Sequence, residues 1–375
     1  MDFSLTQEQE LVRASARDFC DREVVPHARD WDRDEDIDRA LVAKLAEVGY
    51  LGAWELDTIS YALVMEELGR ADSSVRGIVS VNVGLVGKTI AKWGTEEQRS
   101  EWLPRLASGE ALGCYALTEP GSGSDPASLL TRANRDGGDW VLSGSKIFIT
   151  LGSWAGLALV FARTGEDGAR GLSCFLVPTD TPGFSATRIK GKLGLRAQDT
   201  AELTLDSVRV SESSVLGGEG DGFKVAMSAL DNGRISLAAG CVGITQGCLD
   251  ACLRYAGERQ QFGKPIASHQ LVQELIADIG VECQAARLLT WHAATLADAG
   301  VRHTLESSIA KYYASEASVR AANAAVQVHG GYGYIDEYPV GKYLRDARVT
   351  TLYEGTSQIQ KLIIGRALTG ESAFT

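Results

Sequence analysis

Residues 353–358 contain one glutamate, Glu354, in a setting where a carboxylate could act as a general base. Glu354 stands directly before Gly355, and Thr356 follows at the predicted start of the last helix. The positive end of a helix dipole favours anions near that start, and a base on a loop there can reach a bound substrate. The same residues are also typical of the start of a helix, with Thr356 as the N-cap. The residues alone leave both interpretations open.

Residues 115–125 are the second segment that could take part in chemistry. A short apolar strand containing Tyr115 and Leu117 runs into a turn rich in glycine and serine, including Ser122 and Ser124. Such a turn can point successive backbone N–H groups and hydroxyls at an anion or at the edge of a heteroaromatic ring. An ordinary β-turn is the other interpretation of the same residues.

Several familiar catalytic patterns are missing from the sequence. The chain contains no complete G-x-G-x-x-G, no P-loop and no nucleophile elbow. Residues 218–222 carry a partial glycine pattern, but Glu219 and Asp221 would repel a phosphate, so we interpret this segment as a hinge. The seven cysteines include no C-x-x-C pair, and the five histidines have no metal-ligand spacing. We therefore expect reduced, buried thiols and no metal site.

The hydrophobic pattern divides the chain into three parts. In the first part, Thr6 with Gln9 and Thr95 with Gln98 have the form of capping boxes, which predicts that helices begin there. Further helices are predicted over residues 61–68 and 75–93. The middle part changes to short β-type runs with a hairpin turn at residues 134–139. These runs cover residues 140–142, 146–149, 157–161, 173–177 and 201–206.

Helical patterns return in the last part of the chain, and this order of elements predicts the fold class. The predicted helices cover residues 223–255, 270–299, 305–328 and 356–368. Because strands do not alternate with helices, a doubly wound sheet is disfavoured. The prediction is an α+β fold with an N-terminal helical domain over residues 1–113, a middle β domain over 114–221 and a C-terminal helical domain over 222–375.

Composition narrows the class of protein. The chain has 375 residues, of which 45% are hydrophobic and 23% are charged, as expected of a globular protein with a core. The net charge of −12 is unfavourable for general nucleic-acid binding, although it does not exclude an anionic ligand, which senses local charge. No apolar run reaches the ~18 residues of a membrane span, and residues 1–20 lack the apolar stretch of a signal peptide. We expect no membrane association and a cytoplasmic location.

The sequence resembles the acyl-CoA dehydrogenase family over nearly its whole length. The resemblance rests on six segments in the family's order, at residues 115–125, 146–150, 192–196, 259–263, 327–331 and 353–358. It implies an N-terminal helical domain, a middle β domain and a C-terminal four-helix bundle, in agreement with the pattern above. It also implies a homotetramer with one FAD per subunit, which residues of a neighbouring subunit also reach.

The resemblance implies an α,β-dehydrogenation of an acyl-CoA thioester to the trans-2-enoyl-CoA. The family removes the α-hydrogen as a proton and the β-hydrogen as a hydride to flavin N5, and passes the electrons to an electron-transfer flavoprotein. Glu354 matches the family's catalytic base. Some relatives place the base on another helix, at the position that is Gly233 here, and a glycine cannot act as a base. Burial must raise the pKa of the base toward that of the weakly acidic α-proton.

The resemblance also assigns binding residues. Phe148 and Thr150 match the pair beside the isoalloxazine ring, with Phe148 standing where many relatives have tryptophan, and Arg259 and Phe262 match residues that reach the FAD of a neighbouring subunit. The full set implied for the cofactor is Tyr115, Leu117, Thr118, Ser124, Phe148, Thr150, Arg259, Phe262, Gln327, Gly330, Gly331, Thr356 and Gln358. The set implied for the substrate is Ser124, Asp231, Arg234 and Tyr353.

One departure and several alternatives accompany the resemblance. The family usually carries a longer loop where only Ala53, Trp54 and Glu55 stand between Gly52 and Leu56. Other activities compatible with the same fold are dehydrogenation of an acyl chain on an acyl carrier protein, and an acyl-CoA oxidase. A non-catalytic acyl-thioester or flavin-binding relative belongs to a different class, and the presence of Glu354 argues against it. Acyl chain length is not encoded in any single motif.

Overall fold

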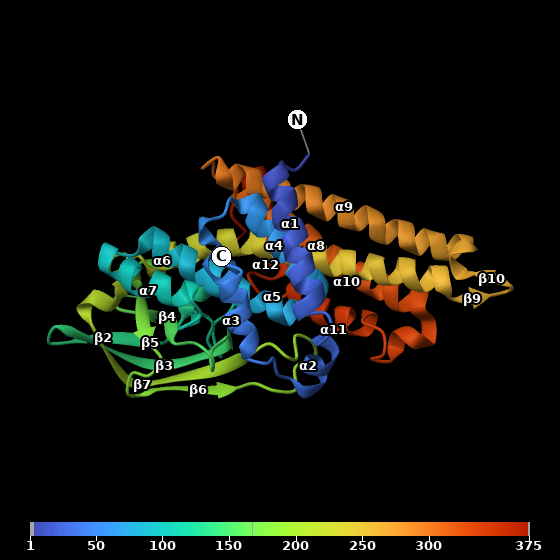
Figure 1. Ribbon diagram of the computed structural model, residues 1–375. Coiled ribbons are helices and arrows are strands. Elements are labelled where there is room, and N and C mark those ends of the chain that lie inside the picture. The colour runs from blue at the N-terminus through green and yellow to red at the C-terminus, as the bar shows by residue number, and fades with distance from the viewer. Residues whose placement is uncertain (1–3, 167, 374–375) are drawn as a thin grey trace.

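The computed structural model describes residues 4–166 and 168–373. Helices occupy the two ends of the chain and a sheet occupies its middle (Figure 1). The sheet lies at one end of the molecule, and the long helices of the C-terminal part extend away from it. The α+β fold with helical, β and helical regions in that order is confirmed.

The N-terminal region is a set of mostly short helices. Thr6 accepts a hydrogen bond from the backbone of Gln9, and Thr95 does the same for Gln98, so both predicted capping boxes are confirmed. The helix that contains Pro104 continues past it to Ala107. The elements are α1 (Gln7–Glu23), α2 (Ala28–Asp34), α3 (Ala40–Glu47), η1 (Tyr50–Glu55), α4 (Thr58–Ala71), α5 (Ser73–Val79), η2 (Ser80–Gly87), α6 (Lys88–Trp93) and α7 (Glu96–Ala107).

The short segment before α4 is held in place by the packing of one aromatic ring. Residues 50–55 form the 3-10 helix η1, and the Trp54 ring of this helix packs directly on Gly87, where an added Cβ would lie 2.4 Å from the ring. Tyr50, Leu51 and Ala53 are buried in the core. The segment is therefore a packed connection between α3 and α4.

The middle region is an eight-stranded sheet in the order β6-β7-β3-β2-β4-β5-β8, with β1 paired parallel to β4. The predicted hairpin at residues 134–139 is confirmed as the β2–β3 turn, in which Gly137 has a φ of 66°. The strands are β1 (Gly113–Ala116), β2 (Arg132–Asp136), β3 (Asp139–Thr150), β4 (Leu157–Arg163), β5 (Leu172–Pro178), β6 (Phe184–Arg188), β7 (Thr200–Ser211) and β8 (Val215–Leu216).

Strand β3 contains an irregularity that matters for the site. Its pairing with β7 shifts register between Lys146 and Ile149, and Phe148 inside that gap has a φ of 60°. A bulge of this kind turns a side chain out of the regular alternation. Phe148 is 65% exposed as a result, although it lies near the end of a long strand.

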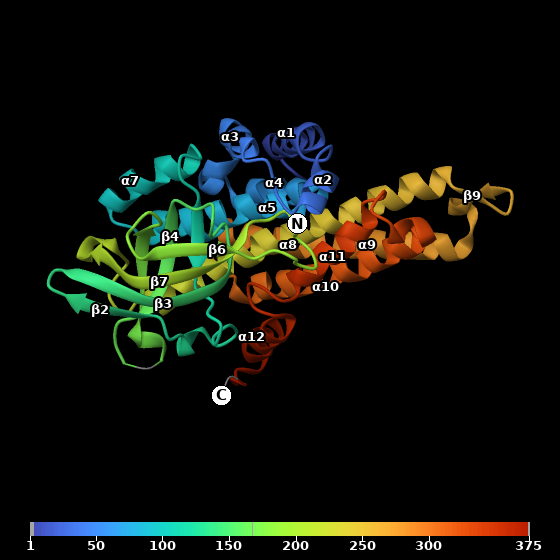
Figure 2. The same ribbon diagram turned by 90° about the horizontal axis from the view of Figure 1, so that it is seen from below.

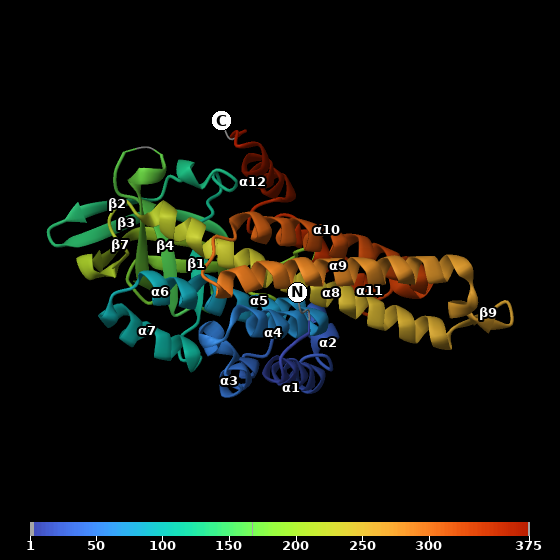
Figure 3. The same ribbon diagram turned by 90° about the horizontal axis from the view of Figure 1, so that it is seen from above.

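The C-terminal region consists of three long helices and two shorter ones. Helix α8 is long and apolar enough to cross a membrane by length and composition, but 83% of its most apolar stretch is buried inside the protein, as in a core helix. The helices are α8 (Gly222–Glu258), α9 (Gln270–Asp298), α10 (Thr304–His329), α11 (Val340–Thr350) and α12 (Ser357–Thr369). A small hairpin, β9 (Gln260–Gln261) with β10 (Lys264–Pro265), joins α8 to α9 at the end farthest from the sheet (Figures 1 and 3). Helix α12 lies beside the sheet end of α10 (Figures 2 and 3).

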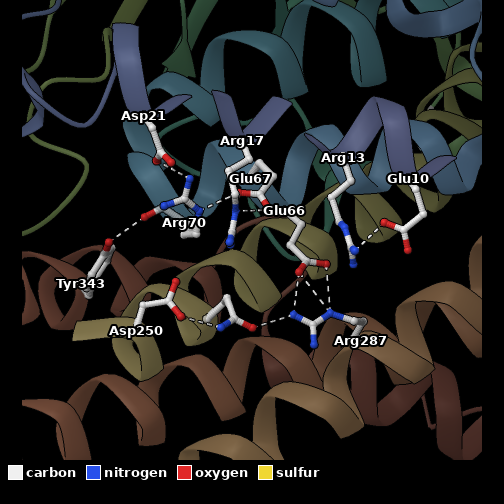
Figure 4. Close-up of polar contacts among 11 residues, drawn as sticks. Glu10, Arg13, Arg17, Asp21, Glu66, Glu67, Arg70, Asp250, Arg287 and Tyr343 are labelled. Atoms are coloured by element: carbon white, nitrogen blue, oxygen red, sulfur yellow. Dashed lines mark hydrogen bonds and ion pairs between the residues drawn. The ribbon is translucent and has the colours of Figure 1, made fainter. Parts of the chain in front are cut away.

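A buried ion pair ties helix α4 of the N-terminal region to the long helix α9 (Figure 4). Glu66 of α4 binds Arg287 of α9 at 2.7 Å, and Arg287 also donates to Gln246 of α8 at 2.9 Å. Glu67, the neighbour of Glu66, accepts from Arg70 at 2.6 Å. Removing one partner from such a buried pair would leave an uncompensated charge, at a cost of about 3–5 kcal/mol. The Glu66–Arg287 pair fixes α4 against α9, whereas the Glu67–Arg70 pair lies within α4 itself.

Candidate active site

One large cavity, of about 1550 Å³, lies where the sheet meets the helices. Its walls come from α5 and η2, from the end of β3, from α8, and from the loop that joins α11 to α12. Seven basic and four acidic side chains line it, so the cavity is locally basic in a chain whose net charge is −12. An anionic ligand of considerable size is therefore compatible with this space.

Glu354 lies on the loop between α11 and α12, and the structure holds its backbone from two sides. Gln360 donates to the carbonyl oxygens of Glu354 and Gly355, each at 3.1 Å, and Lys311 donates to that of Gly355 at 2.7 Å. Glu354 has a φ of 55° and Gly355 has one of 86°. Thr356 then caps α12 by accepting from the backbone of Ile359, so the helix-entry interpretation is confirmed.

The carboxylate of Glu354 lines the cavity, and no ion pair with another described residue neutralises it. Its Oε2 atom is buried and has no hydrogen-bond partner among the described residues. The backbone of Gly233 leaves the room for this atom, because a Cβ added there would lie 2.5 Å from Oε2. The missing side chain at Gly233 thus leaves the space that the Glu354 carboxylate occupies.

Burial raises the pKa of Glu354, and the positive charges of Arg76, Lys311 and Arg234 oppose that shift. The net effect is a carboxyl group whose pKa lies above its ordinary value. Burial also lowers the pKa of Lys311 to about 8, so part of the opposing charge is weak at mildly alkaline pH. This combination suits a general base, which needs to be ionised and yet basic enough to take a weakly acidic proton.

The residues assigned to the substrate border the same cavity. Asp231 accepts from Arg234 at 2.6 Å and from Thr304 at 3.0 Å, which joins α8 to the start of α10. The Nε atom of Arg234 is buried without a partner among the described residues. Tyr353 lines the cavity next to Glu354, and Ser124 lies at its exposed rim. The structure therefore brings all four residues to one space.

Seven of the thirteen residues assigned to the cofactor line this cavity as well. The bulge in β3 presents Phe148 to it, and Thr150 accepts a hydrogen bond from Gln198 at 3.1 Å. Tyr115 donates to the carbonyl oxygen of Ala226 in α8 at 3.2 Å, which joins the sheet to the long helix. The seven are Tyr115, Leu117, Thr118, Ser124, Phe148, Thr150 and Thr356.

The other six assigned residues lie outside the cavity. Arg259 and Phe262 are exposed at the β9–β10 hairpin, where Phe262 is 93% exposed with a φ of 53°. Gln327, Gly330 and Gly331 are exposed at the end of α10, and the Arg259 guanidinium lies 5.4 Å from the centre of the Tyr332 ring, so the two groups are neighbours. Gln358 is exposed on α12. Figure 1 places the hairpin at the far end of the molecule from the sheet.

The structure adds residues that the sequence analysis did not single out for a role. Lys146 and Glu119 form an ion pair at 2.7 Å, with both side chains almost fully buried, and Glu119 also accepts from the backbone of Leu130 and Thr131. This pair fixes residues 117–131 against β3. Arg76 and Lys311 lie near Glu354. The sequence gives no sign that Arg76 and Lys311 lie beside Glu354, because each is a basic residue in a helix and such residues are usually exposed.

Comparison with known proteins agrees with this architecture. Three family models match: the acyl-CoA dehydrogenase N-terminal domain at residues 6–110, the middle domain at 114–208 and the C-terminal domain at 220–369. The chain is 43% identical over 375 residues to an acyl-CoA dehydrogenase of Bacillus subtilis, covering 98% of this chain and 99% of the relative. It is 42% identical to the short-chain specific acyl-CoA dehydrogenase of mouse mitochondria, over 96% of this chain and 90% of that protein.

Solved structures of other proteins share the architecture of this chain. A chain from a study of the electron transferring flavoprotein of Acidaminococcus fermentans superposes with a TM-score of 0.97 and 38% identity, over 99% of this chain and 100% of the other. A glutaryl-CoA dehydrogenase from Mycobacterium smegmatis in complex with FADH2 gives a TM-score of 0.95 and 37% identity, over 99% and 97%.

The fold and the site define an oxidoreductase that acts on CH–CH bonds. The chain belongs to the acyl-CoA dehydrogenase family.

Proposed function

We propose that the protein removes the α-proton and the β-hydride of an acyl-CoA thioester, with Glu354 as the base and FAD as the hydride acceptor. The observation that carries this proposal is the buried, unpartnered Oε2 of Glu354 inside a locally basic cavity. A carboxylate held in this way has no structural partner to satisfy. It is free to take a proton from a substrate that expels the remaining water.

The residues around Glu354 supply the rest of the base's environment. The backbone N–H of Glu354 has no acceptor among the described residues, so it can donate to a substrate carbonyl oxygen. Such a donor stabilises the negative charge that develops on that oxygen when the α-proton leaves. Lys311 and Gln360 hold the loop through its carbonyl oxygens, so the position of the Glu354 N–H relative to the Glu354 carboxylate is fixed.

The lining of the cavity fits an FAD at the sheet side. The exposed ring of Phe148, the hydroxyl of Thr150 and the backbone of residues 117–118 offer a flat apolar surface beside hydrogen-bonding groups. The buried Glu119–Lys146 pair holds that backbone. When bound, FAD supplies the acceptor for the hydride of the β-carbon. A relative of 37% identity is described with FADH2, which supports the same cofactor here.

We also propose a homotetramer, and the positions of the remaining cofactor residues support an assembly of more than one copy. Arg259 and Phe262 are exposed at the far end of the same chain, remote from its cavity, and Gln327, Gly330 and Gly331 are exposed at the end of α10. A second copy would bring this end to the cavity of the first. We also propose an electron-transfer flavoprotein as the acceptor of the electrons, supported by the structural neighbour from that system.

The cytoplasm is the location that we propose. All seven cysteines are buried and unpaired, which suits a reducing compartment. Fractionation of the host cells tests this location.

A flavin titration tests the proposed function. The purified protein should show an oxidised flavin spectrum, and butyryl-, octanoyl- or isobutyryl-CoA added without oxygen should bleach it. Glu354→Gln should keep the spectrum and lose the bleaching, whereas Glu371→Gln, at an exposed residue, should behave as the native protein. A flavin that no CoA thioester bleaches would point to an acyl carrier protein substrate. Rapid peroxide formation in air would show an oxidase, and absence of flavin would overturn the proposal.

A further inference from the structure

Gln198 is a buried polar side chain of the cavity wall to which the proposed function gives no role. It is only 6% exposed, and its Nε2 atom donates to the Thr150 hydroxyl oxygen at 3.1 Å. Thr150 is the last residue of β3 and pairs with Thr200, the first residue of β7, and Gln198 stands two places before Thr200. The register of the two strands therefore brings Gln198 beside Thr150.

Gly77 of α5 determines which way the Gln198 amide faces. A Cβ added at Gly77 would lie 1.9 Å from Oε1 of Gln198, so the amide oxygen occupies the space that the missing side chain leaves. The Cα hydrogens of a glycine are weak donors, which an oxygen accepts, whereas an NH2 group would oppose hydrogen to hydrogen. The amide oxygen therefore faces Gly77, and the amide nitrogen faces Thr150.

The turn that carries Gln198 is held by charged side chains. Lys192 donates to the carbonyl oxygen of Gln198 at 2.9 Å, and the backbone N–H of Gln198 donates to the carbonyl oxygen of Leu195 at 3.1 Å. The backbone N–H of Leu195 donates to Asp346 of α11 at 2.6 Å, and Asp346 binds Lys342 at 2.6 Å. The backbone and the amide of Gln198 are therefore both fixed relative to Thr150.

The hydrogen bond from Gln198 determines where the Thr150 hydroxyl can donate. A threonine hydroxyl has one hydrogen to donate and lone pairs that accept. The amide N–H of Gln198 occupies one lone pair of Thr150, and within residues 4–166 and 168–373 the hydroxyl hydrogen has no acceptor. This hydrogen must avoid the side from which the Gln198 N–H approaches. The cavity, which Thr150 lines, is where it can meet an acceptor.

A flavin ring in the cavity would complement this hydroxyl. The edge of an oxidised isoalloxazine ring carries nitrogen and carbonyl oxygen atoms that accept hydrogen bonds. A hydride brings two electrons and so adds negative charge to the ring. A donor that is already aimed at the ring stabilises that charge without having to reorient during the reaction.

We propose that Gln198 is a positioning residue, which holds the Thr150 hydroxyl as a donor toward the flavin ring and so makes the flavin easier to reduce. The inference rests on the proposed function and adds a residue to it. The dehydrogenation is unchanged, with the α-proton going to Glu354 and the β-hydride to FAD. Gln198 acts through Thr150 and does not touch the reacting carbons.

Three single substitutions test this inference through the midpoint potential of the bound flavin, measured without oxygen and with FAD in excess. Thr150→Val removes the hydroxyl. Gln198→Glu introduces a carboxylate that only accepts, so it should draw the Thr150 hydrogen away from the flavin. In both proteins at pH 8, reduction of the flavin should be about 10-fold less favourable, which is about 30 mV for a two-electron couple. Gln198→Met frees the hydroxyl to rotate and should have a smaller effect.

The pH dependence of the Gln198→Glu protein separates the direction of the hydrogen bond from a loss of packing. Once protonated, the introduced carboxyl can donate to the Thr150 oxygen as the amide does. The difference in potential from the native protein should therefore narrow as the pH falls from about 8 to about 5. The Thr150→Val protein, which has no added carboxyl, should keep a constant difference.

A double substitution shows whether Gln198 acts through Thr150. In the Thr150→Val protein, Gln198→Met should cause no further change in the potential. Gln98→Met is the matched control, because Gln98 is likewise 6% exposed but donates to the carbonyl oxygens of Ser213 and Val215, outside the cavity. It should lower the melting temperature and leave the potential of the flavin unchanged.

The remaining outcomes separate this inference from the proposed function. Native potentials in both Gln198 variants, with flavin bound, would overturn the role of Gln198 and leave the proposed function intact. An equal fall in potential when Gln198→Glu is added to Thr150→Val would show that the introduced charge acts on the flavin directly, which also overturns it. Absence of bound flavin from the native protein would instead overturn the proposed function.

Discussion

Gly233→Ala is the sharpest test of where the structure places the carboxylate of Glu354, the proposed base. The single added Cβ would lie 2.5 Å from Oε2 of Glu354, 3.1 Å from its Cδ and 3.0 Å from a methyl group of Leu85. A carbon and an oxygen atom need more than 3 Å between them, so the carboxylate must move by roughly 0.5–1 Å. The loop that carries it is held by Lys311 and Gln360, so the movement falls mainly on the Glu354 side chain.

The expected effect is large on activity and small on stability. A displacement of about 1 Å of a reacting group costs on the order of 100-fold in rate. Alanine is favoured over glycine within a helix by about 1 kcal/mol, which offsets part of the strain that the contact introduces. We therefore expect kcat to fall about 100-fold while the melting temperature changes by only a few degrees and the flavin remains bound.

The measurement is the rate of anaerobic flavin bleaching beside thermal unfolding. Gly257→Ala is the matched control, since it lies in the same helix with nothing within 4 Å of the added carbon, and it should be fully active. In a Glu354→Ala background, Gly233→Ala should have no further effect on the residual rate. A Gly233→Ala protein with native kcat would refute the placement of Glu354 against Gly233.

Three further predictions concern stability and reactivity. Lys146→Met should leave Glu119 buried and unpaired, which should lower the free energy of unfolding by about 3–5 kcal/mol and weaken flavin binding. Calorimetry and the FAD content of the purified protein measure these two effects. Adding Glu119→Gln to the Lys146→Met protein should recover part of the lost stability. Because burial raises the pKa of Glu354, its neutral form favours folding, and that contribution is lost as the pH rises through this pKa. Glu354→Gln should accordingly melt higher than the native protein at pH 7–8 and show no such gain near pH 4, and a lower melting point at pH 8 would contradict the direction of the shift. A thiol reagent should label none of the seven cysteines in the folded protein and all seven after unfolding, and labelling before unfolding would show that a thiol is accessible.

The sequence predicts much of the fold because its local signals are strong. The capping boxes at Thr6 and Thr95 and the turn at Gly137 determine where elements begin by short-range hydrogen bonds and backbone conformation. Such signals involve residues three or four apart, so a single chain reveals them. The helix at residues 340–350 has no comparable cap on a side chain, and the pattern did not reveal it.

The site was predictable only where a motif marks it. Glu354 and Thr150 belong to segments shared with a family, whereas Arg76 lies in a helix with nothing unusual in its sequence. Its burial depends on Gly240, 164 positions away, and its lack of a carboxylate partner among the described residues depends on Lys342 holding Asp72. Neither relation is visible along the chain, because each joins elements that meet only in the folded state.

Helix α8 shows how the fold and the site come to depend on one another. Gly233, Gly240 and Gly247 recur every seven residues, which is two turns, and Gly243 lies on the same face. An added Cβ would meet Glu354 at the first, Arg76 at the second and the Tyr343 hydroxyl at the third, all at 2.6 Å or less. At Gly243 it would lie 2.0 Å from the carbonyl oxygen of Glu66.

Each of these glycines costs the helix about 1 kcal/mol relative to alanine, so together they weaken α8 by about 4 kcal/mol. That cost is offset only if the close approach of neighbouring groups to α8 contributes packing or makes room for a functional side chain. At two positions it is the packing of α4 and α11 against α8. At the other two it is the room for a base and for a buried arginine. One face of one helix therefore holds the N-terminal domain in place and shapes the cavity around Glu354 and Arg76, so substitutions on this face should separate into those that alter stability and those that alter activity.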